Sequence, residues 1–435
     1  ALESLLGLPM RNPQIAERIC GADAPTDIGS KLPKASRNEL RCATARALGK
    51  KALATVPRSI AFWPGATVHS TGFQGGWNIE EVLEALATQS TNLDDFYLRI
   101  SPLLPSSAII DLKTAMEQLE PLVEQNLLEK RSNFQRNAKK VLMDAIASRG
   151  MLDFLAQTGQ LLGSRWPKDL PITVALVPVP ISRGSGIHTY AHRAGPVVIV
   201  EVLENDVLDH RLGVVAHELV HVLWFSRPLE RVEKLAEAFR AASPSYGRIV
   251  LTLLSEGIAT SLGNGIFVAR GSKDPPPGPW YADPEIDSFA RLLFPLLQHR
   301  LEKIETIDKA FARQVVELFG ARSPQAAVNP RLNFRHTILI ADGHLAKGNN
   351  LSKRVRAHLG SERIQIFEAS NSSMNREIIA RLGDYGTILV ASPLNTESLE
   401  SCWVVGRHGD MASLLLVGSL SLTWGQASGS ASGSE

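Results

Sequence analysis

The segment Leu212–Phe225 has the sequence LGVVAHELVHVLWF, an apolar run whose polar side chains are His217, Glu218 and His221. Residues four apart in an α-helix lie on one face, with Cβ atoms about 5–6 Å apart. Both histidines can therefore converge on one metal ion, while Glu218 faces the open coordination position. The β-branched run at 197–200 predicts a strand just before this helix. The sequence therefore predicts a strand at 197–200, followed by a helix that carries an HExxH metal-binding motif.

A catalytic zinc ion usually takes three protein ligands and keeps a fourth position for water. The metzincin pattern would need Gly at position 224 and His at position 227, where this chain has Trp224 and Arg227. A Gly-Thr-x-x-Asp pattern, which would supply an aspartate, does not occur downstream. A Glu-Gly-x-Ala pattern does occur, with Glu256 in an apolar, helix-like stretch where an unpaired carboxylate would be costly to bury. Glu256 is therefore the predicted third ligand.

His217-Glu218-x-x-His221 together with Glu256-Gly257-x-Ala259 resembles the gluzincins, the thermolysin-like class of zinc metallopeptidases. The resemblance covers roughly residues 170–300, less than a third of the chain. It implies that His217, His221 and Glu256 are zinc ligands and that Glu218 is the general base. Taken singly, either histidine is more simply a core residue and Glu256 a helix-end carboxylate, but the combination favours a metal site.

Two positions depart from the gluzincin pattern. Ser255 precedes the third ligand where many members have Asn, and Thr260 stands where thermolysin-like enzymes place an Asp that orients a zinc-bound histidine. We therefore expect the partner of that histidine to come from elsewhere, with Asp206 and Asp209 as candidates. The long separation of His221 and Glu256 indicates an inserted element, and the amphipathic segment 226–248 predicts that this element is a helix.

The resemblance also implies a Tyr or His, beyond the third ligand, that donates a hydrogen bond to the oxyanion of the reaction. Tyr281 is our first candidate for this donor, and His299 and Tyr246 are the alternatives. Tyr281 lies in a proline-rich loop, where an aromatic residue can equally be a packing anchor.

In this class, an edge strand before the HExxH helix pairs with an extended peptide substrate. The strands predicted at 172–177 and 197–202 are candidates for that edge. His188 and His192 lie between these strands, and we expect them at the surface or lining the cleft. The resulting functional hypothesis is a zinc-dependent metallopeptidase that acts on a peptide or protein. The alternative is a peptidase-like binding protein with a structural or vestigial zinc, whose C-terminal domain binds a ligand or partner.

The composition is that of a globular protein of 435 residues with 44% hydrophobic and 21% charged residues, which indicates two to four domains. The net charge of +2 provides no strong field for nucleic acid. No apolar stretch reaches the length of about 20 residues that a membrane-spanning helix needs. Cys20 and Cys42 could form one disulfide, which would favour a periplasmic or secreted location, whereas three free thiols would suit a cytosol equally.

The sequence predicts an α+β protein in four parts. Residues 1–165 form a mostly helical N-terminal region, with helices expected at 38–53 and 79–89, and residues 166–330 form a catalytic domain with a small sheet and the HExxH helix. Residues 331–425 form an α/β domain, and 426–435 a flexible tail. In the α/β domain, β-branched runs predict strands at 337–341, 363–367, 387–391 and 414–417. Helical segments are predicted between them at 351–359, 375–382 and 396–405. This alternation is typical of a parallel sheet.

Overall fold

The computed structural model describes residues 68–69, 77–104, 132–164, 170–179, 189–203, 206–270 and 276–333, apart from a few single positions, together with isolated residues between these ranges. Beyond residue 335 it describes the backbone of six strands. The helix predicted at 38–53, the Cys20–Cys42 disulfide, His188, the helices predicted at 351–359 and 375–382 and the tail lie outside the described residues.

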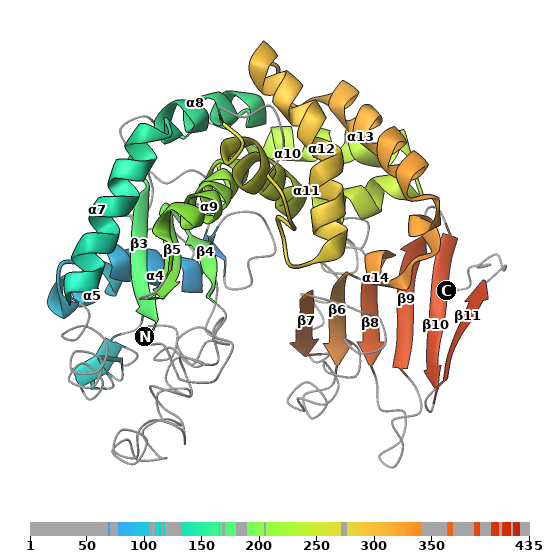
Figure 1. The fold of residues 1–435 in the computed structure, drawn as a ribbon. Helices are drawn as coiled ribbons and strands as arrows, with labels where there is room; N and C mark the ends of the chain where they lie inside the picture. The colour runs from blue at the N-terminus through green and yellow to red at the C-terminus, as the bar shows by residue number, and fades with distance from the viewer. Residues whose placement is uncertain are drawn as a thin grey trace. The chain divides into compact units, whose positions relative to one another are not determined.

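The chain divides into two compact units (Figure 1). One unit comprises Ala1–Val232 and Gly257–Thr306, and the other comprises Glu233–Glu256 and Ile307–Glu435. The boundary between Glu256 and Gly257 falls inside a single helix, α11 (Tyr246–Ala259). The four domain limits inferred from the sequence stay a prediction.

The first unit contains most of the elements around the HExxH motif. Its helices are α4 (Ile79–Gln89), α5 (Leu93–Ile100), α7 (Ser132–Ser148), α8 (Met151–Leu162), the 3-10 helix η3 (Leu208–Arg211), α9 (Leu212–Phe225), the π-helix η4 (Thr260–Phe267) and α12 (Pro284–Lys303). Its strands are β1 (Val68–His69), β2 (Trp77–Asn78), β3 (Thr173–Val179), β4 (Ala191–Ala194) and β5 (Val197–Leu203). The helix predicted at 79–89 and the strands predicted at 172–177 and 197–202 are confirmed as α4, β3 and β5.

The sheet of this unit has the strand order β3-β5-β4. β3 runs parallel to β5, with Thr173 opposite Val197, and β4 runs antiparallel to β5, with Ala191 opposite Val200. The described part of the chain is mainly helical with this small mixed sheet, as expected of an α+β protein. β5 is nearly continuously apolar because it is the central strand, and α9 packs against β4 and β5 while α7 lies along β3 (Figure 1).

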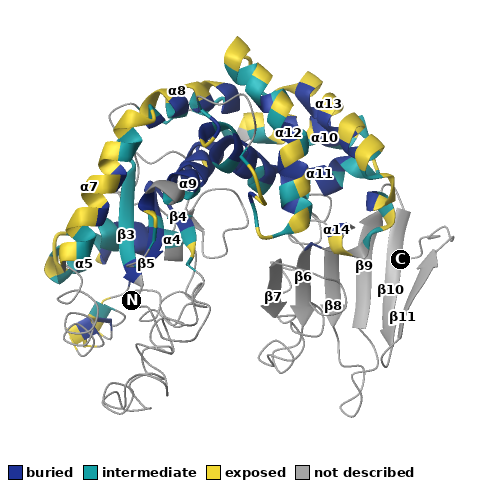
Figure 2. Ribbon diagram, in the orientation of Figure 1, coloured by how far each residue is buried: buried dark blue, intermediate teal, exposed yellow. Residues whose placement is uncertain are grey.

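Helix α9 is the buried core helix of this unit. Nearly all its residues from Leu212 to Trp224 are buried, and Figure 2 shows it dark blue along most of its length. A helix that is apolar on all sides is stable only when other elements surround it. Here β4 and β5, α8 and η4 pack against α9. His217, Glu218 and His221 are therefore held on a rigid element inside the protein.

Helix α11 continues directly into the π-helix η4. Although the sequence analysis expected no membrane-spanning helix, the combined helix Tyr246–Phe267 is long and apolar enough to cross a membrane by length and composition. Its most apolar window is 67% buried inside the protein, which is typical of the core helix of a globular fold. One helix of this kind is weak evidence for a membrane span, and burial against neighbouring elements accounts for its apolar residues.

Two glycines allow this long helix to approach its neighbours closely. A Cβ on Gly257 would lie 2.8 Å from Cε1 of Phe289, in α12, and a Cβ on Gly263 would lie 2.6 Å from Cα of His217. Real Cβ atoms essentially never come within 3.0 Å of such neighbours. Gly257 of the Glu-Gly-x-Ala pattern is thus needed for packing against α12. Gly263 sets the distance between η4 and the backbone of the HExxH helix.

Replacing Gly263 by alanine is expected to lower the free energy of unfolding by about 1–3 kcal/mol, because an added methyl would meet the backbone of α9 and force the two helices apart. Urea unfolding of the purified protein measures this change. Gly159→Ala is the matched control, since its Cβ would meet no atom within 4 Å and alanine is the better helix former. Equal stability of Gly263→Ala and the wild type would contradict the close approach.

The second unit begins with most of α10 (Leu229–Ala242) and the first part of α11. It continues with α13 (Lys309–Arg322), the 3-10 helix η5 (Pro324–Val328) and α14 (Pro330–Asn333). Phe239 of α10 packs edge-on against Phe311 of α13 at a centroid distance of 6.4 Å. The helix predicted in the segment 226–248 is confirmed as α10.

The C-terminal strands form one sheet with the order β11-β10-β9-β8-β6-β7. The strands are β6 (His336–Ala341), β7 (Arg363–Glu368), β8 (Thr387–Ala391), β9 (Cys402–His408), β10 (Met411–Gly418) and β11 (Ser421–Gln426). β6 pairs in parallel with β7 and with β8, but β9, β10 and β11 are antiparallel. The sheet is therefore mixed, which corrects the prediction of a parallel sheet. The helix predicted at 396–405 is wrong over 402–405, which belongs to β9.

Candidate metal site

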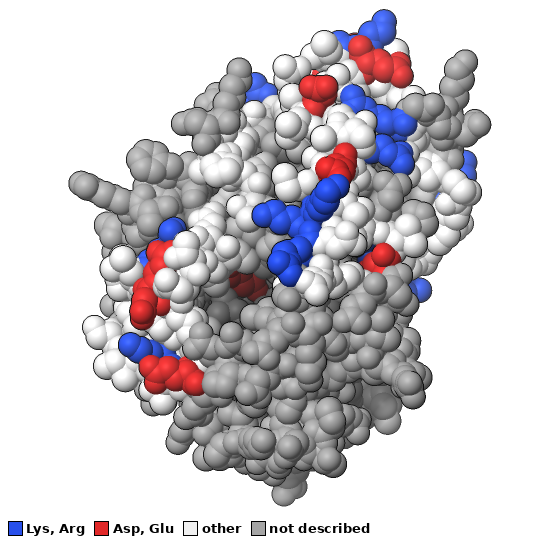
Figure 3. Space-filling view, turned by 60° about the vertical axis from the view of Figure 1, so that its left-hand side comes forward, with Lys and Arg blue, Asp and Glu red and all other residues white. Residues whose placement is uncertain are grey.

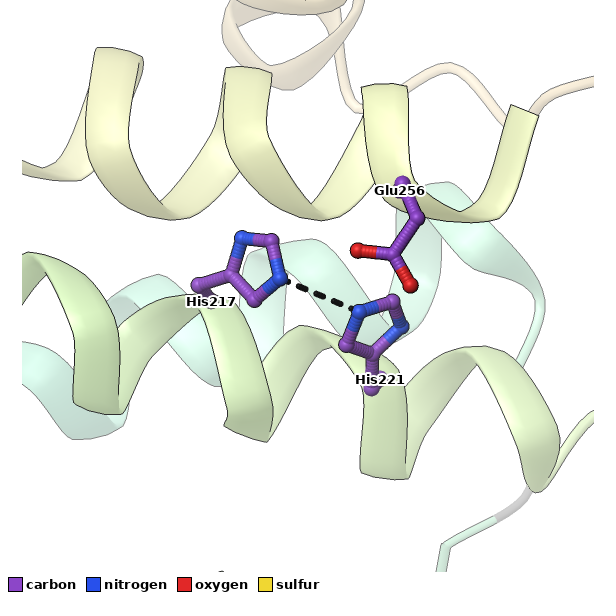
Figure 4. A group of neighbouring side chains, drawn as sticks. All are labelled: His217, His221 and Glu256. Atoms are coloured by element: carbon purple, nitrogen blue, oxygen red, sulfur yellow. Dashed lines mark hydrogen bonds between the residues drawn. The ribbon is translucent and has the colours of Figure 1, made fainter. Parts of the chain in front are cut away.

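His217, His221 and Glu256 form one cluster of possible metal ligands (Figure 4). The histidines come from successive turns of α9 and the carboxylate comes from α11. One ligand atom from each residue lies within 4.8 Å of the other two. In the part of the chain that the structure describes, this is the one group of three His, Cys, Asp or Glu residues arranged to hold a metal ion.

The geometry of the two imidazoles fits a shared metal ion. Their Nε2 atoms face each other at 3.1 Å, and both side chains are buried. Two nitrogens bound at about 2.0–2.1 Å to one tetrahedral ion would be about 3.3 Å apart, close to the distance observed. Without an ion, two neutral imidazoles that present these atoms to each other can share one proton between them. The donor set of two imidazoles and a carboxylate can thus hold a metal ion.

Thr260 contacts Nδ1 of His217, the ring nitrogen on the other side from Nε2. Its hydroxyl lies 3.5 Å from Nδ1 of His217, and the side chain is fully buried. A polar contact of this histidine thus comes from Thr260, at the position where thermolysin-like enzymes have an Asp. Asp206, one of the two expected sources, instead accepts hydrogen bonds from Arg211 at 2.8 Å and from the backbone N–H of Leu203 at 2.7 Å. The side chain of Asp209 lies outside the described residues.

Replacing Thr260 by valine is expected to weaken metal binding about 10- to 100-fold, the usual cost of removing a partner of a metal-bound histidine. The hydroxyl can accept a hydrogen bond from the Nδ1–H group of His217, which favours the tautomer whose Nε2 lone pair is available to the metal. Competition with a chromophoric chelator measures the affinity. Thr252→Val on the same helix is the control, because the Thr252 hydroxyl bonds to the carbonyl of Ile249. If both variants bind metal like the wild type, the Thr260 hydroxyl has no such role.

Glu218 is a buried carboxylate with 8% of its surface exposed. Among the residues that the structure describes, no hydrogen bond or ion pair involves its side chain. A buried carboxylate without a partner destabilises the folded state. A carboxylate with a purely structural role therefore normally pairs with a cation or accepts a hydrogen bond from an N–H group. In the sequence, Glu218 directly follows His217, one of the possible ligands.

Of the three candidate oxyanion donors, the structure brings Tyr281 to the cluster. The Tyr281 ring stacks on the His217 ring with a centroid distance of 5.9 Å and an interplanar angle of 21°. The hydroxyl of Tyr246 donates a hydrogen bond to the carbonyl of Pro324 at 3.0 Å, which commits it elsewhere. His299 is an exposed residue of α12. Tyr281 is therefore the candidate that the geometry favours.

Two pairs of polar side chains link β4 to α4, and the sequence analysis missed them. His192 Nε2 lies 3.3 Å from a carboxylate oxygen of Glu84, with both side chains buried, which corrects the expected surface or cleft position of His192. Arg193 pairs with Glu81 at 3.1 Å. The spacing of Glu81 and Glu84, i and i+3 on a helix, was the available signal, but it did not identify their partners on a strand more than 100 residues later.

Arg227 occupies the position where a metzincin would have its third histidine. Its Nε donates to the carbonyl of Trp224 at 2.8 Å, and its guanidinium lies 3.3 Å from the centroid of the Trp224 ring. Burial lowers the pKa of Arg227 to about 9. A cation at the C-terminal end of a helix is stabilised by the partial negative charge of the last carbonyls. The Arg227 side chain therefore binds a carbonyl in the last turn of α9 and is not part of the ligand cluster.

No family model, curated protein or solved structure matches this chain. Functional inference therefore depends on the chemistry and geometry of the site itself.

Proposed function

We propose that the protein is a zinc-dependent metallopeptidase of the gluzincin type. The observation that carries the proposal is the convergence of His217 and His221 from α9 with Glu256 from α11. Two histidines and one glutamate are the protein ligands of catalytic zinc in thermolysin-like enzymes, which leaves one position for water. The buried Glu218, which has no hydrogen-bonding or ionic partner among the described residues, adds a base that a purely structural metal site would not need.

The side chains around the cluster supply the remaining chemistry. A bound zinc ion would lower the pKa of its water to about 7 and polarise the substrate carbonyl. Glu218 accepts the proton of the attacking water and passes it to the leaving amine. The hydroxyl of Tyr281 donates a hydrogen bond to the oxyanion that develops on the carbonyl oxygen. Thr260 holds the His217 ring in the orientation that binding requires.

The proposed substrate is a peptide or protein segment in extended form. β5 is the central strand of the small sheet, so the prediction that it could be the substrate-binding edge is wrong. β4 is an edge strand that packs against α9, and β5 is its one neighbour among the described strands. Its outer edge can add an extended peptide by main-chain hydrogen bonds beside the HExxH helix.

The surface charge gives no support to a nucleic-acid partner. Groups of basic side chains lie beside groups of acidic ones on the face in Figure 3. The net charge of +2 and the mixture of both signs on this face favour no extended positive field there.

Metal content and cleavage of a mixed peptide library by the purified chain test the proposal. We expect about one zinc per chain, cleavage that a chelator abolishes, and recovery when zinc is added back. Zinc binding without cleavage of any peptide would favour the peptidase-like binding protein. Absence of metal binding would show that the cluster is a packing arrangement of the helices.

A further inference from the structure

The loop that carries Tyr281 is fixed by hydrogen bonds to Asp287 in the first turn of α12. Oδ1 of Asp287 accepts two consecutive backbone N–H groups, that of Trp280 at 2.6 Å and that of Tyr281 at 3.2 Å. Its Oδ2 accepts the Nε–H of Arg291 at 2.9 Å. Arg291 also donates to the carbonyl of Gly278 in the same loop. One carboxylate thus joins the loop backbone to the helix that follows it.

Trp280 anchors the same loop from the other side. The side-chain amide of Asn264, in η4, donates to the Trp280 carbonyl at 2.6 Å. The indole N–H donates to the carbonyl of Pro276 at 3.0 Å, and the side chain is buried. The indole fits against Gly265, whose Cβ would lie 2.8 Å from Cζ3 of Trp280. The residue next to Tyr281 is therefore held by its N–H, its carbonyl and its ring.

The ionic state of Asp287 suits this arrangement. Burial alone would raise the pKa of its carboxyl, but hydrogen bonds from Arg291 and from the N–H groups of Trp280 and Tyr281 outweigh burial and lower it. A carboxyl whose folded pKa is lowered contributes stability above its unfolded pKa of about 3.9 and loses it as pH falls through the folded value. At neutral pH both oxygens are charged acceptors.

Helix capping does not account for these bonds. The N-terminus of α12 is already capped by Asp283, which accepts the N–H groups of Glu285 and Ile286. Asp287 instead reaches back to residues before the helix. The effect is to fix the backbone of Tyr281, whose ring lies on His217.

We propose that Asp287 and Asn264 are positioning residues that hold Tyr281 over the metal cluster, and that they act on the reaction through Tyr281. The inference rests on the proposed function. On a surface loop without these bonds, the Tyr281 hydroxyl would sample many positions, and a hydrogen-bond donor contributes to catalysis only when it is held where charge develops. The clamp formed by Asp287 and Asn264 supplies that fixed placement from α12 and η4.

A double-mutant cycle tests the route through Tyr281. Tyr281→Phe should lower kcat about 10²- to 10³-fold, the usual loss for one oxyanion donor. Asp287→Ala should lower kcat in the same direction with little change in KM, and Asp287→Asn, which keeps one acceptor oxygen, should recover part of the loss. Adding Asp287→Ala to Tyr281→Phe should cause no further decrease. Additive losses would overturn the proposal. Asp144→Ala, in an exposed ion pair of α7, is the control.

Hydrogen–deuterium exchange of the full chain examines the clamp independently of activity. The peptide containing Trp280 and Tyr281 should exchange slowly in the wild type and faster in Asp287→Ala, while peptides of α9 stay protected. Asn264→Ala, which removes one bond to the loop, serves if Asp287→Ala fails to fold. Unchanged exchange in the variants would overturn the clamp. A wild type that binds zinc and protects this peptide but cuts nothing would overturn the proposed function and leave the clamp standing.

Discussion

Replacing Glu218 by glutamine is expected to lower kcat for peptide cleavage by about 10²- to 10⁴-fold, because the amide cannot accept the proton of the attacking water. Metal content should be unchanged, since His217, His221 and Glu256 remain. Steady-state kinetics together with metal analysis of the purified variant measure both quantities. This separation of turnover from metal binding distinguishes a general base from a ligand.

The same variant should be at least as stable as the wild type. Glu218 is buried and has no ionic or hydrogen-bonding partner among the described residues, so its charge costs folding free energy that a neutral amide of the same shape costs less. Residues retained for activity often carry such a cost. Glu237→Gln, an exposed position of α10, is the control. A marked loss of thermal stability in Glu218→Gln alone would point to a structural carboxylate and against the catalytic role.

The sequence predicted α9 and the ligand cluster because their signals are local. Four-residue spacing places His217 and His221 on one face of any helix, and the apolar surroundings of Glu256 indicate a carboxylate that needs a partner. β4 was missed because Ala191–Ala194 is short and lacks the alternation of apolar residues that identifies a strand. Its place beside α9 depends on contacts between distant segments.

Two differences between the sequence-based predictions and the structure involve contacts between distant segments. The sequence analysis expected a carboxylate beside His217 and did not consider the hydroxyl of Thr260, which lies 3.5 Å from Nδ1 of that ring. The segment 402–405 was taken for the end of a helix, yet the antiparallel neighbours β8 and β10 make it a strand. Strand propensity is strongly dependent on such neighbours.

Replacing His221 by alanine should have the largest effect on metal binding. It removes one of two Nε2 atoms that lie 3.1 Å apart, and the remaining pair, His217 and Glu256, cannot complete a three-ligand site. Removing a residue that only hydrogen-bonds to a metal ligand lowers metal affinity by up to about 100-fold. We expect the loss of the ligand itself to lower the affinity by more than this factor. Competition with a chelator measures the loss, and Glu256→Gln should reproduce it.

Thermal unfolding with and without zinc gives an independent measurement of the same loss. A ligand that binds only the folded state at about 100 times its dissociation constant stabilises that state by about 2.7 kcal/mol. The wild type and His299→Ala, which changes an exposed histidine of α12, should therefore both unfold at a higher temperature when zinc is present. His221→Ala should show no zinc-dependent increase. If it keeps the full increase, the zinc ion binds elsewhere, and the closeness of the two imidazoles reflects helix packing alone.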